Sequence, residues 1–236
     1  MDLPLLLYGF LVAIVLIAIA WFAFVLPSER RQLERKLALV QKRIAEREAR
    51  KAEAVIRDES KADSEDSRGI LETRRLRLRK LTTADAPFML ALLNDPAFHQ
   101  YIGDRGVQSE AQARDYIKHG AIASYAQFGY GMYLAELKSD GRPAGICGLV
   151  RRDGLDDPDL GFAFMPEFRS QGLGSEAASA VLQYAVNAMA LPRVVAIVTP
   201  DNQASIALLH KAGMRQDGTV RMPDGDADLD LYVYEV

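Results

Sequence analysis

The chain has 236 residues, of which 49% are hydrophobic and 26% are charged, as is usual for globular proteins. Its formal net charge is −3, so no global excess of basic residues points to nucleic acid as a partner. The single cysteine, Cys147, excludes an intrachain disulfide and fits a reducing compartment. These averages conceal three parts of very different composition.

The first part is an uncharged apolar segment over residues 3–26. As a helix it would be about 36 Å long, enough to span a hydrocarbon core of about 30 Å. A cleaved signal peptide is the alternative, but the flank carries Asp2, the apolar run is too long and no A-x-A site follows. We therefore expect residues 1–27 to form a transmembrane anchor.

The charges beside this segment predict its orientation. Residues 27–43 contain six basic and two acidic side chains, whereas the N-terminal flank has no fixed basic side chain. The positive-inside rule then places the rest of the chain in the cytoplasm. The sequence thus predicts a single-pass membrane protein whose larger domain is cytoplasmic.

A charged helical stalk is expected over residues 28–58, with Ser28 as its N-cap. Apolar residues follow the spacing of a coiled-coil seam for about two heptads, whereas a coiled coil usually needs three or four; they are Leu33, Leu37, Val40 and Ile44. A solvated stalk and a homodimerisation element both remain open. The polar residues 59–70 lack periodicity and indicate a flexible linker.

The third part, residues 71–236, has the mixed pattern of an α/β domain. Helices are expected at 84–93, 110–127, 175–189 and 202–211. Strands are expected at 76–79, 131–137, 144–150, 160–165, 194–199, 214–220 and 229–236. Two of the helices are preceded and followed by strands, so part of the sheet should be parallel.

A glycine-containing turn between a strand and a helix carries the sharpest chemical signal. Arg169, Gly172 and Gly174 form the pattern R-x-x-G-x-G directly before the helix expected from Ser175. Glycines allow several backbone N–H groups to point at one spot, where the helix dipole also favours an anion such as a pyrophosphate. The spacing matches neither a Rossmann fingerprint nor a P-loop. Taken alone, the motif could equally be a purely structural turn.

A second motif follows about thirty residues later in the chain. Asn202 and Ser205 begin a helix directly after a strand, and L-x-K-x-G-M follows. Simple capping by Asp201 or Asn202 explains the helix start but not the rest of the pattern. The two motifs in this order resemble the GNAT acetyltransferase superfamily. The stretches 73–86 and 145–149 resemble its RimJ/RimL-like branch, and the whole resemblance covers about residues 72–236.

The resemblance implies an α/β fold with a mixed, mostly antiparallel sheet that splays into a V and is flanked by helices. It also implies acetyl-CoA as a co-substrate. Backbone and side-chain groups of the turn would hold the CoA pyrophosphate; these residues are Arg169, Gln171, Gly172, Leu173, Gly174 and Ser175. The backbone of Phe164 and Met165 would pair with the pantetheine arm, to which the Asn202 side chain would also hydrogen-bond.

The implied reaction is direct attack of a primary amine on the acetyl thioester, with a protein N-terminal α-amine as one candidate acceptor. Asp159 is the first candidate for the general base, unless it is a solvent-facing member of the acidic turn 156–159. Many GNAT enzymes place a Tyr acid where this chain has Leu209, and Ser205 is the candidate substitute, unless it is only a first-turn helix residue. No metal-ligand spacing occurs, so no metal is expected.

Two other functions remain open at this stage. The domain could bind CoA as a non-catalytic sensor, because the usual acid is missing at Leu209. The chain could also serve primarily as a membrane-anchored interaction protein whose stalk dimerises.

Overall fold

The computed structural model describes residues 13–17, 42, 47, 69–223, 225 and 227–235. Two compact units divide the chain, Met1–Lys61 and Ala62–Val236. Within the first unit, residues 13–17 are helical and their apolar side chains are exposed. Among the described residues, no helix has both the length and the apolar character that a membrane crossing requires. Most of the predicted anchor, stalk and linker lies outside the described residues, so the membrane segment and the stalk dimer stay predictions.

The second unit contains an eight-stranded sheet in the order β1-β2-β3-β4-β5-β6-β8-β7. The strands are β1 (Leu71–Glu72), β2 (Leu76–Lys80), β3 (Met132–Leu137), β4 (Pro143–Val150), β5 (Asp159–Phe164), β6 (Arg193–Val198), β7 (Arg215–Arg221) and β8 (Asp228–Glu235). All neighbours pair antiparallel except β5 and β6, which are parallel. The predicted mixed, mostly antiparallel sheet is therefore confirmed.

The α-helices of this unit are α2 (Ala86–Leu93), α3 (Pro96–Tyr101), α4 (Glu110–Ile117), α5 (Ala123–Phe128), α6 (Leu173–Asn187) and α7 (Gln203–Lys211). Short 3-10 turns occur at Thr83–Asp85 and Pro166–Phe168. A π-helical segment, Lys118–Ile122, joins α4 to α5.

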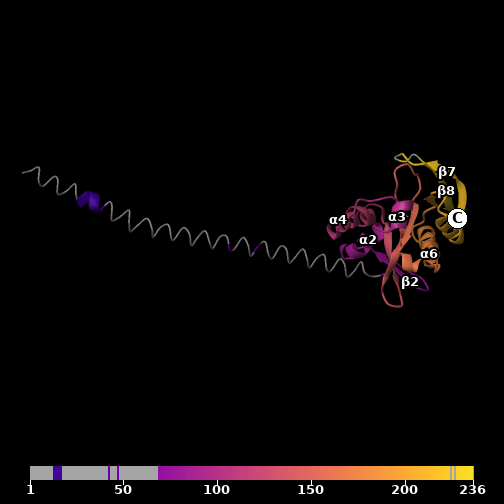
Figure 1. Cartoon of the computed structure of the whole chain (residues 1–236), viewed down its shortest axis with the longest axis horizontal. Coiled ribbons are helices and arrows are strands. Elements are labelled where there is room, and N and C mark those ends of the chain that lie inside the picture. The colour runs from indigo at the N-terminus through magenta and orange to yellow at the C-terminus, as the bar shows by residue number, and fades with distance from the viewer. Residues whose placement is uncertain are drawn as a thin grey trace, which may run out of the picture. The chain divides into compact units, whose positions relative to one another are not determined.

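Helices cover both faces of the sheet, with α2 and α4 on one side of the strands and α6 on the other (Figure 1). The buried residues form two clusters that correspond to these faces. One contains the apolar stripe of α6, and the other contains the buried residues of α2, α3 and α4. In α6 the buried positions recur every three to four residues, as an amphipathic helix requires.

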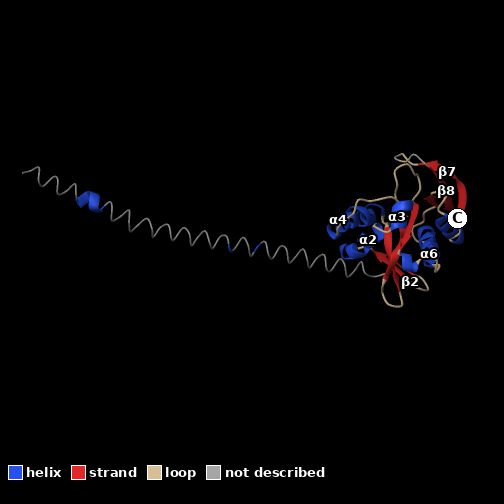
Figure 2. Ribbon diagram, in the orientation of Figure 1, coloured by secondary structure: helices blue, strands red, loops and turns tan. Residues whose placement is uncertain are grey.

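Strand alternation divides β5 between the two clusters, because successive side chains point to opposite faces. Phe162 and Phe164 lie on the side of the α6 cluster and Ala163 lies against the α2–α4 cluster, while Met165, just after the strand, packs against both. At the far edge of the sheet, β8 and β7 form a hairpin beyond β6 (Figure 2). The two helical layers therefore meet β5 from opposite sides, which places this strand at the centre of the domain.

Candidate active site

The sheet opens where the two parallel strands separate. Within the described chain, β5 and β6 pair at a single register position, Asp159 with Val195. A regular parallel pair would continue along both strands with evenly spaced hydrogen bonds. The strands part instead, so the remainder of β5 has an unpaired edge on the side facing β6. This separation is the V-shaped splay expected from the sequence.

The unpaired edge of β5 presents backbone groups to the opening. The Met165 N–H donates to the Ala144 carbonyl at 2.9 Å, so Met165 is in a hydrogen-bonded pair with β4. Because such pairs alternate along an antiparallel ladder, the backbone N–H groups of Phe162 and Phe164 point away from β4, toward the opening. The pantetheine role expected for Phe164 agrees with this direction.

Both backbone groups of Met165 are engaged within the protein, so its expected contact with the pantetheine arm stays a prediction. Its N–H is bonded within the sheet, and its carbonyl accepts from the Phe168 N–H at 2.9 Å. Its half-buried side chain packs against both core clusters. Phe162, which the sequence analysis did not single out, shares the orientation of Phe164 because it lies two residues earlier on the same strand.

The turn between β5 and α6 is built around a left-handed residue at the helix start. Gly172 is the N-cap of α6 with φ of 76°, a conformation that costs glycine little. The first backbone bond of the helix runs from Glu176 N–H to the Gly172 carbonyl at 3.1 Å. Among the described residues, the N–H groups of 171–175 have no protein acceptor. They form a set of free donors at the positive end of a 15-residue helix.

Gly174 is required for a different reason, namely close packing. A Cβ on this residue would lie 2.7 Å from Leu208 Cδ1 and 3.5 Å from a ring carbon of Phe164. The first turn of α6 therefore sits directly against α7 and the end of β5. This contact brings the free N–H groups of the turn close to the open edge of β5.

The Arg169 side chain does not extend into the turn as a free donor. Its Nε–H donates to the Phe164 carbonyl at 2.8 Å, and one Nη contacts the Asp95 carboxylate. Asp95 is buried and also caps α3 by accepting from the N–H groups of Ala97 and Phe98. In this structure the Arg169 guanidinium joins β5 to α3, and its expected contact with the pyrophosphate stays a prediction.

Gln171 also makes contacts within the protein. The side-chain Nε2 of Gln171 donates to the Glu167 backbone carbonyl at 2.6 Å, and the backbone carbonyl of Gln171 accepts from Arg75 Nη1 at 2.9 Å. The amide donor of the side chain is therefore engaged, while the backbone N–H remains free. The turn would accordingly bind an anion through main-chain groups rather than through the side chains of Arg169 and Gln171.

Asn202 caps α7, as the simpler interpretation of the second motif predicts. Its Oδ1 accepts from the Ser205 N–H at 3.1 Å, which leaves Nδ2 available as a donor. Ser205 is half-buried in the first turn of α7. Within the described chain its hydroxyl has no hydrogen-bond partner, so it too is available to a ligand.

Asp159 lies at the point where β5 and β6 separate, and it is 1% exposed. Its Oδ1 accepts from the Ile197 N–H at 3.3 Å, and its Oδ2 contacts Arg152 Nε. The interpretation of Asp159 as a solvent-facing turn residue is therefore wrong. Burial raises the pKa of the Asp159 carboxyl above its ordinary value, and the nearby Arg152 only partly offsets this effect.

The position where many GNAT enzymes carry a tyrosine is part of the core here. Leu209 is 1% exposed and belongs to the cluster beneath α6. The neighbouring His210 is exposed and packs edge-on against Tyr232, with ring centroids 5.3 Å apart. Neither residue supplies a proton donor to the opening between β5 and β6.

Sequence reasoning missed three basic residues around the site. Arg152 contacts Asp159, Arg75 contacts the turn, and Lys211 Nζ lies 3.9 Å from where a Gly172 Cβ would be. Arg75 belongs to the T-x-R-L-x-L-R stretch and Lys211 to the L-x-K-x-G-M stretch, so both had a sequence signal without an assigned role.

The remaining candidate groups do not form a separate site. In the part of the chain that the structure describes, no cluster of His, Cys, Asp and Glu could hold a metal ion. Cys147 is buried, and its burial raises the pKa of the thiol well above the ordinary range. It therefore acts as a small apolar core residue rather than as a nucleophile.

Known proteins share this architecture. Residues 75–215 match the family model described as acetyltransferase (GNAT) domain. The uncharacterized N-acetyltransferase YoaA of Bacillus subtilis is 30% identical over 171 residues, covering 71% of this chain and 96% of YoaA. An acetyltransferase of Agrobacterium tumefaciens superposes with a TM-score of 0.60 at 26% identity, covering 70% of this chain and 94% of that one. RimL, the ribosomal L7/L12 α-N-protein acetyltransferase solved with CoA, has the same fold at 20% identity, with a TM-score of 0.62 and coverage of 71% and 98%.

Proposed function

The chain belongs to the GNAT family and is an acetyl-CoA-dependent N-acetyltransferase, and we propose that it acetylates a primary amine by direct attack in a ternary complex. The observation that carries this proposal is the set of free N–H groups at 171–175 beside the unpaired edge of β5. The N–H groups at 171–175 can bind a diphosphate, and the edge of β5 can hydrogen-bond an extended arm that contains amides. CoA contains both in series.

Main-chain groups would do most of the binding. The N–H groups of Gly172, Leu173, Gly174 and Ser175 would donate to the diphosphate, as is usual at helix N-termini. The Phe164 N–H and the Asn202 Nδ2 would hold the pantetheine arm from the two sides of the V, much as an added strand pairs with a sheet edge. Gly172 fits this role because its φ of 76° suits glycine and because, without a side chain, it leaves its backbone accessible beside Arg75 and Lys211.

The protein would promote the reaction chiefly by alignment and by electrostatics. The amine nitrogen forms a bond to the thioester carbonyl carbon while the C–S bond breaks, and CoA leaves as a thiolate. An N–H from the edge of β5, at Phe162 or Phe164, would donate to the carbonyl oxygen as negative charge develops there. Holding the amine nitrogen next to the thioester carbonyl carbon supplies a further large part of the rate enhancement.

The attacking amine must first lose a proton, and Asp159 is the base that we propose. Its raised pKa favours this role, because a base is most effective when its pKa approaches the working pH. Asp159 lies three residues before Phe162, which is about 10 Å along a strand. Transfer would therefore pass through ordered water rather than by direct contact. Ser205, which has a free hydroxyl on the opposite wall, is the candidate donor to the leaving thiolate.

Binding of acetyl-CoA can be tested by thermal unfolding of the full chain. Ligand at about 100 times its Kd should stabilise the protein by about 2.7 kcal/mol. Gly172→Asp puts a carboxylate into the turn and should abolish this stabilisation. Gly129→Asp is a matched control, since Gly129 is also left-handed, with φ of 78°, and has open surroundings. Equal stabilisation of both variants by acetyl-CoA would contradict the assignment of the site.

The acceptor can be identified by measuring free thiol released from acetyl-CoA with a panel of amines. We propose a protein N-terminal α-amine as the first class to test, because the sequence resembles the RimJ/RimL-like branch and RimL acts on such an amine. Polyamines and amino sugars complete the panel. Turnover that requires one class of amine identifies the acceptor. Tight binding of acetyl-CoA without turnover on any amine would favour the sensor instead.

A further inference from the structure

Arg75 connects the start of β2 to the glycine turn through a dense set of hydrogen bonds. Its backbone N–H donates to Glu176 Oε1 at 2.7 Å, and its Nε–H donates to Glu176 Oε2 at 2.7 Å. Its Nη1 donates to the Gln171 carbonyl at 2.9 Å. Thr73 Oγ1 completes the network by donating to Glu176 Oε1 at 2.6 Å. One arginine thus contacts both the turn and the first turn of the helix that follows it.

The bond to the Gln171 carbonyl determines how the turn is aimed. In a trans peptide the C=O of one residue and the N–H of the next lie in one plane and point in opposite directions. Arg75 holds the Gln171 carbonyl toward itself, so the Gly172 N–H is directed to the other side. A carbonyl that rotated into the turn would instead present negative charge to a bound phosphate.

The contacts with Glu176 remove a second obstacle to anion binding. This carboxylate lies in the first turn of α6, where it would repel a bound diphosphate. Its partial burial acts to raise the pKa of Glu176, but hydrogen bonds from Thr73 and Arg75 outweigh that effect and hold the pKa below its ordinary value. The carboxylate is therefore ionised, and its charge is neutralised by Arg75.

Arg75 also leaves one donor group unused beside the turn. Nη2 lies 3.5 Å from the place that a Cβ of Gly172 would occupy, and Lys211 Nζ lies 3.9 Å from the same place. Within the described chain, neither nitrogen has an acidic partner. Two cationic groups from distant parts of the sequence thus lie beside Gly172, the left-handed residue at the start of α6.

We propose that Arg75 is a positioning residue for the diphosphate: it aims the Gln171–Gly172 peptide and neutralises the Glu176 charge, while Lys211 supplies positive charge near Gly172. This inference rests on the proposed function of the turn. The alternative is that Arg75 only fastens the edge of the sheet to α6. That purely structural role would affect every ligand of the site equally, whereas positioning would affect only ligands that carry the diphosphate.

The test compares CoA with pantetheine, which lacks the diphosphate, on the full-length chain. Calorimetry gives the Kd of CoA, and ligand-observed NMR titration gives that of pantetheine. Arg75→Gln should weaken CoA by about ten- to a hundredfold, because a hydrogen bond to a charged group contributes about 1.5–3 kcal/mol. Arg75→Lys keeps the charge but cannot bond both Glu176 and Gln171, so it should weaken CoA by a smaller factor. Pantetheine affinity should stay within about twofold in both variants, a change of under about 0.4 kcal/mol.

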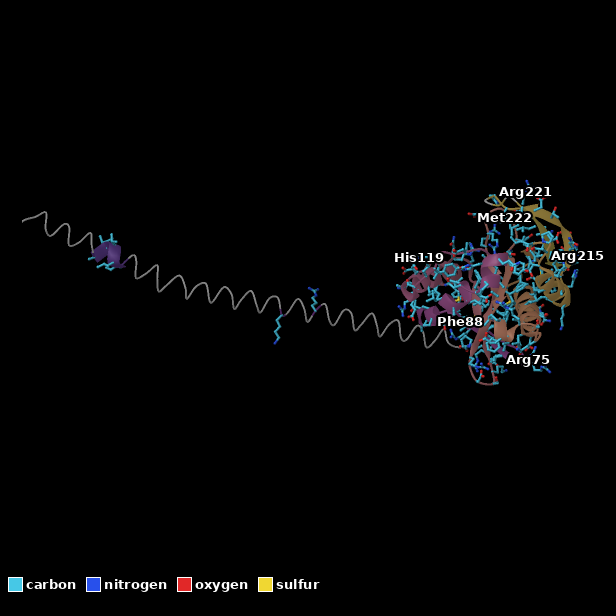
Figure 3. All side chains as sticks on the ribbon, viewed as in Figure 1. Arg75, Phe88, His119, Arg215, Arg221 and Met222 are labelled. Carbon is cyan, nitrogen blue, oxygen red and sulfur yellow. The ribbon has the colours of Figure 1, made fainter. Side chains whose placement is uncertain are left out.

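Arg221→Gln is the matched control. It makes the same change in charge and breaks an exposed pair with Asp228, and Figure 3 shows Arg221 and Arg75 at opposite ends of the domain. An unchanged CoA Kd in the Arg75 variants would overturn the inference, as would equal weakening of CoA and pantetheine. If Arg75→Gln fails to fold, the affinities for CoA and pantetheine are compared in Arg75→Lys and Lys211→Met instead. Failure of the wild-type chain to bind CoA would contradict the proposed function itself, which is a different outcome.

Discussion

At the residue scale, the two alternatives for Asp159 were separated by burial alone. A carboxylate in an acidic turn usually faces water, but this one lies under the separating strands and accepts from the Ile197 N–H. Arg152 is its one cationic partner among the described residues. Burial raises the pKa of Asp159, and Arg152 together with the Ile197 N–H opposes that effect.

Removing Arg152 should raise the pKa of Asp159 further, because only the hydrogen bond from the Ile197 N–H would then oppose the effect of burial. A base acts when deprotonated, so the acidic limb of kcat/KM for the amine should move to higher pH in Arg152→Gln. The raised pKa also affects stability. Protonated Asp159 stabilises the folded state at pH values below the pKa that this carboxyl has in the unfolded chain, and this stabilisation is lost as the pH rises through the pKa in the folded state. Because Arg152→Gln raises the folded-state pKa further, its free energy of unfolding should fall over a wider range of pH than that of the wild type.

Arg151→Gln serves as the control for this experiment, since Arg151 contacts the Asp156 carbonyl at an exposed position. Its pH–rate profile should match that of the wild type. An acidic limb that stays in place in Arg152→Gln would show that Asp159 is not the titrating base.

Asn202 offers a second test at this scale, because its two amide atoms have separate tasks. Asn202→Asp keeps an oxygen for the Ser205 N–H but loses the Nδ2 donor, whereas Asn202→Ala loses both. The alanine variant should lose about 0.5–2 kcal/mol of stability as a lost N-cap, measured by urea unfolding. Both variants should bind CoA more weakly. If Asn202→Asp binds CoA as well as the wild type, the residue is only a cap.

Sequence reasoning was strongest for backbone roles and weakest for long side chains. The conformation of Gly172 follows from a local glycine pattern, which any reader of the sequence can find. The direction of the Arg169 guanidinium depends instead on Asp95, a residue in a different element. Nothing in the spacing of R-x-x-G-x-G reveals that partner, so the sequence alone did not indicate the contact that Arg169 makes here.

At the element scale, the junction of α6, α7 and β5 fixes the position of the turn. Gly174→Ala should force Leu208 to move, because the new Cβ would lie 2.7 Å from Leu208 Cδ1. Such overpacking typically costs about 1–3 kcal/mol. Displacement of the first turn of α6 should also raise the Kd of CoA, as measured by calorimetry.

Ser175→Ala is the control at this junction, since it changes a neighbouring residue of the same turn without adding a carbon atom. Its unfolding free energy and its CoA Kd should stay close to the wild-type values. If Gly174→Ala shows wild-type stability and affinity, the packing argument for this glycine is wrong.

Long periodic elements were predicted well, and short ones were not. The helix expected at 175–189 begins at Leu173, because Gly172 rather than a polar side chain forms its cap. The expected helix 110–127 contains a π-helical segment at Lys118–Ile122 that no periodic pattern indicates. Helix α3 has 6 residues, too few to show a period, so it is absent from the helices that the sequence predicts.

At the scale of the whole molecule, the order of strands explains how residues far apart in the sequence contact one another at the site. The turn follows β5 in the sequence, yet the residue that aims it precedes β2 and lies 96 residues away from Gln171. The sheet and α6 bring these segments together. Motif spacing indicated a mixed sheet, but contacts between its distant parts required the structure.

The N-terminal third should have no part in cofactor binding. Residues 62–236 form a compact unit with its own buried clusters, so a protein lacking residues 1–61 should bind CoA with the Kd of the full chain. Cell fractionation tests the other prediction for this region. Loss of residues 1–61 should release the protein from membranes if residues 3–26 span the bilayer. Weaker CoA binding by the shorter protein would contradict the independence of the two units.

The central claim is that the free N–H groups of the turn converge on a diphosphate. A crystal structure of the chain with CoA tests it most directly. The account predicts diphosphate oxygens at about 2.7–3.2 Å from the backbone nitrogens of at least three residues within 171–175, with Arg75 still bonded to the Gln171 carbonyl. A diphosphate bound elsewhere, with these N–H groups facing water or protein, would contradict it.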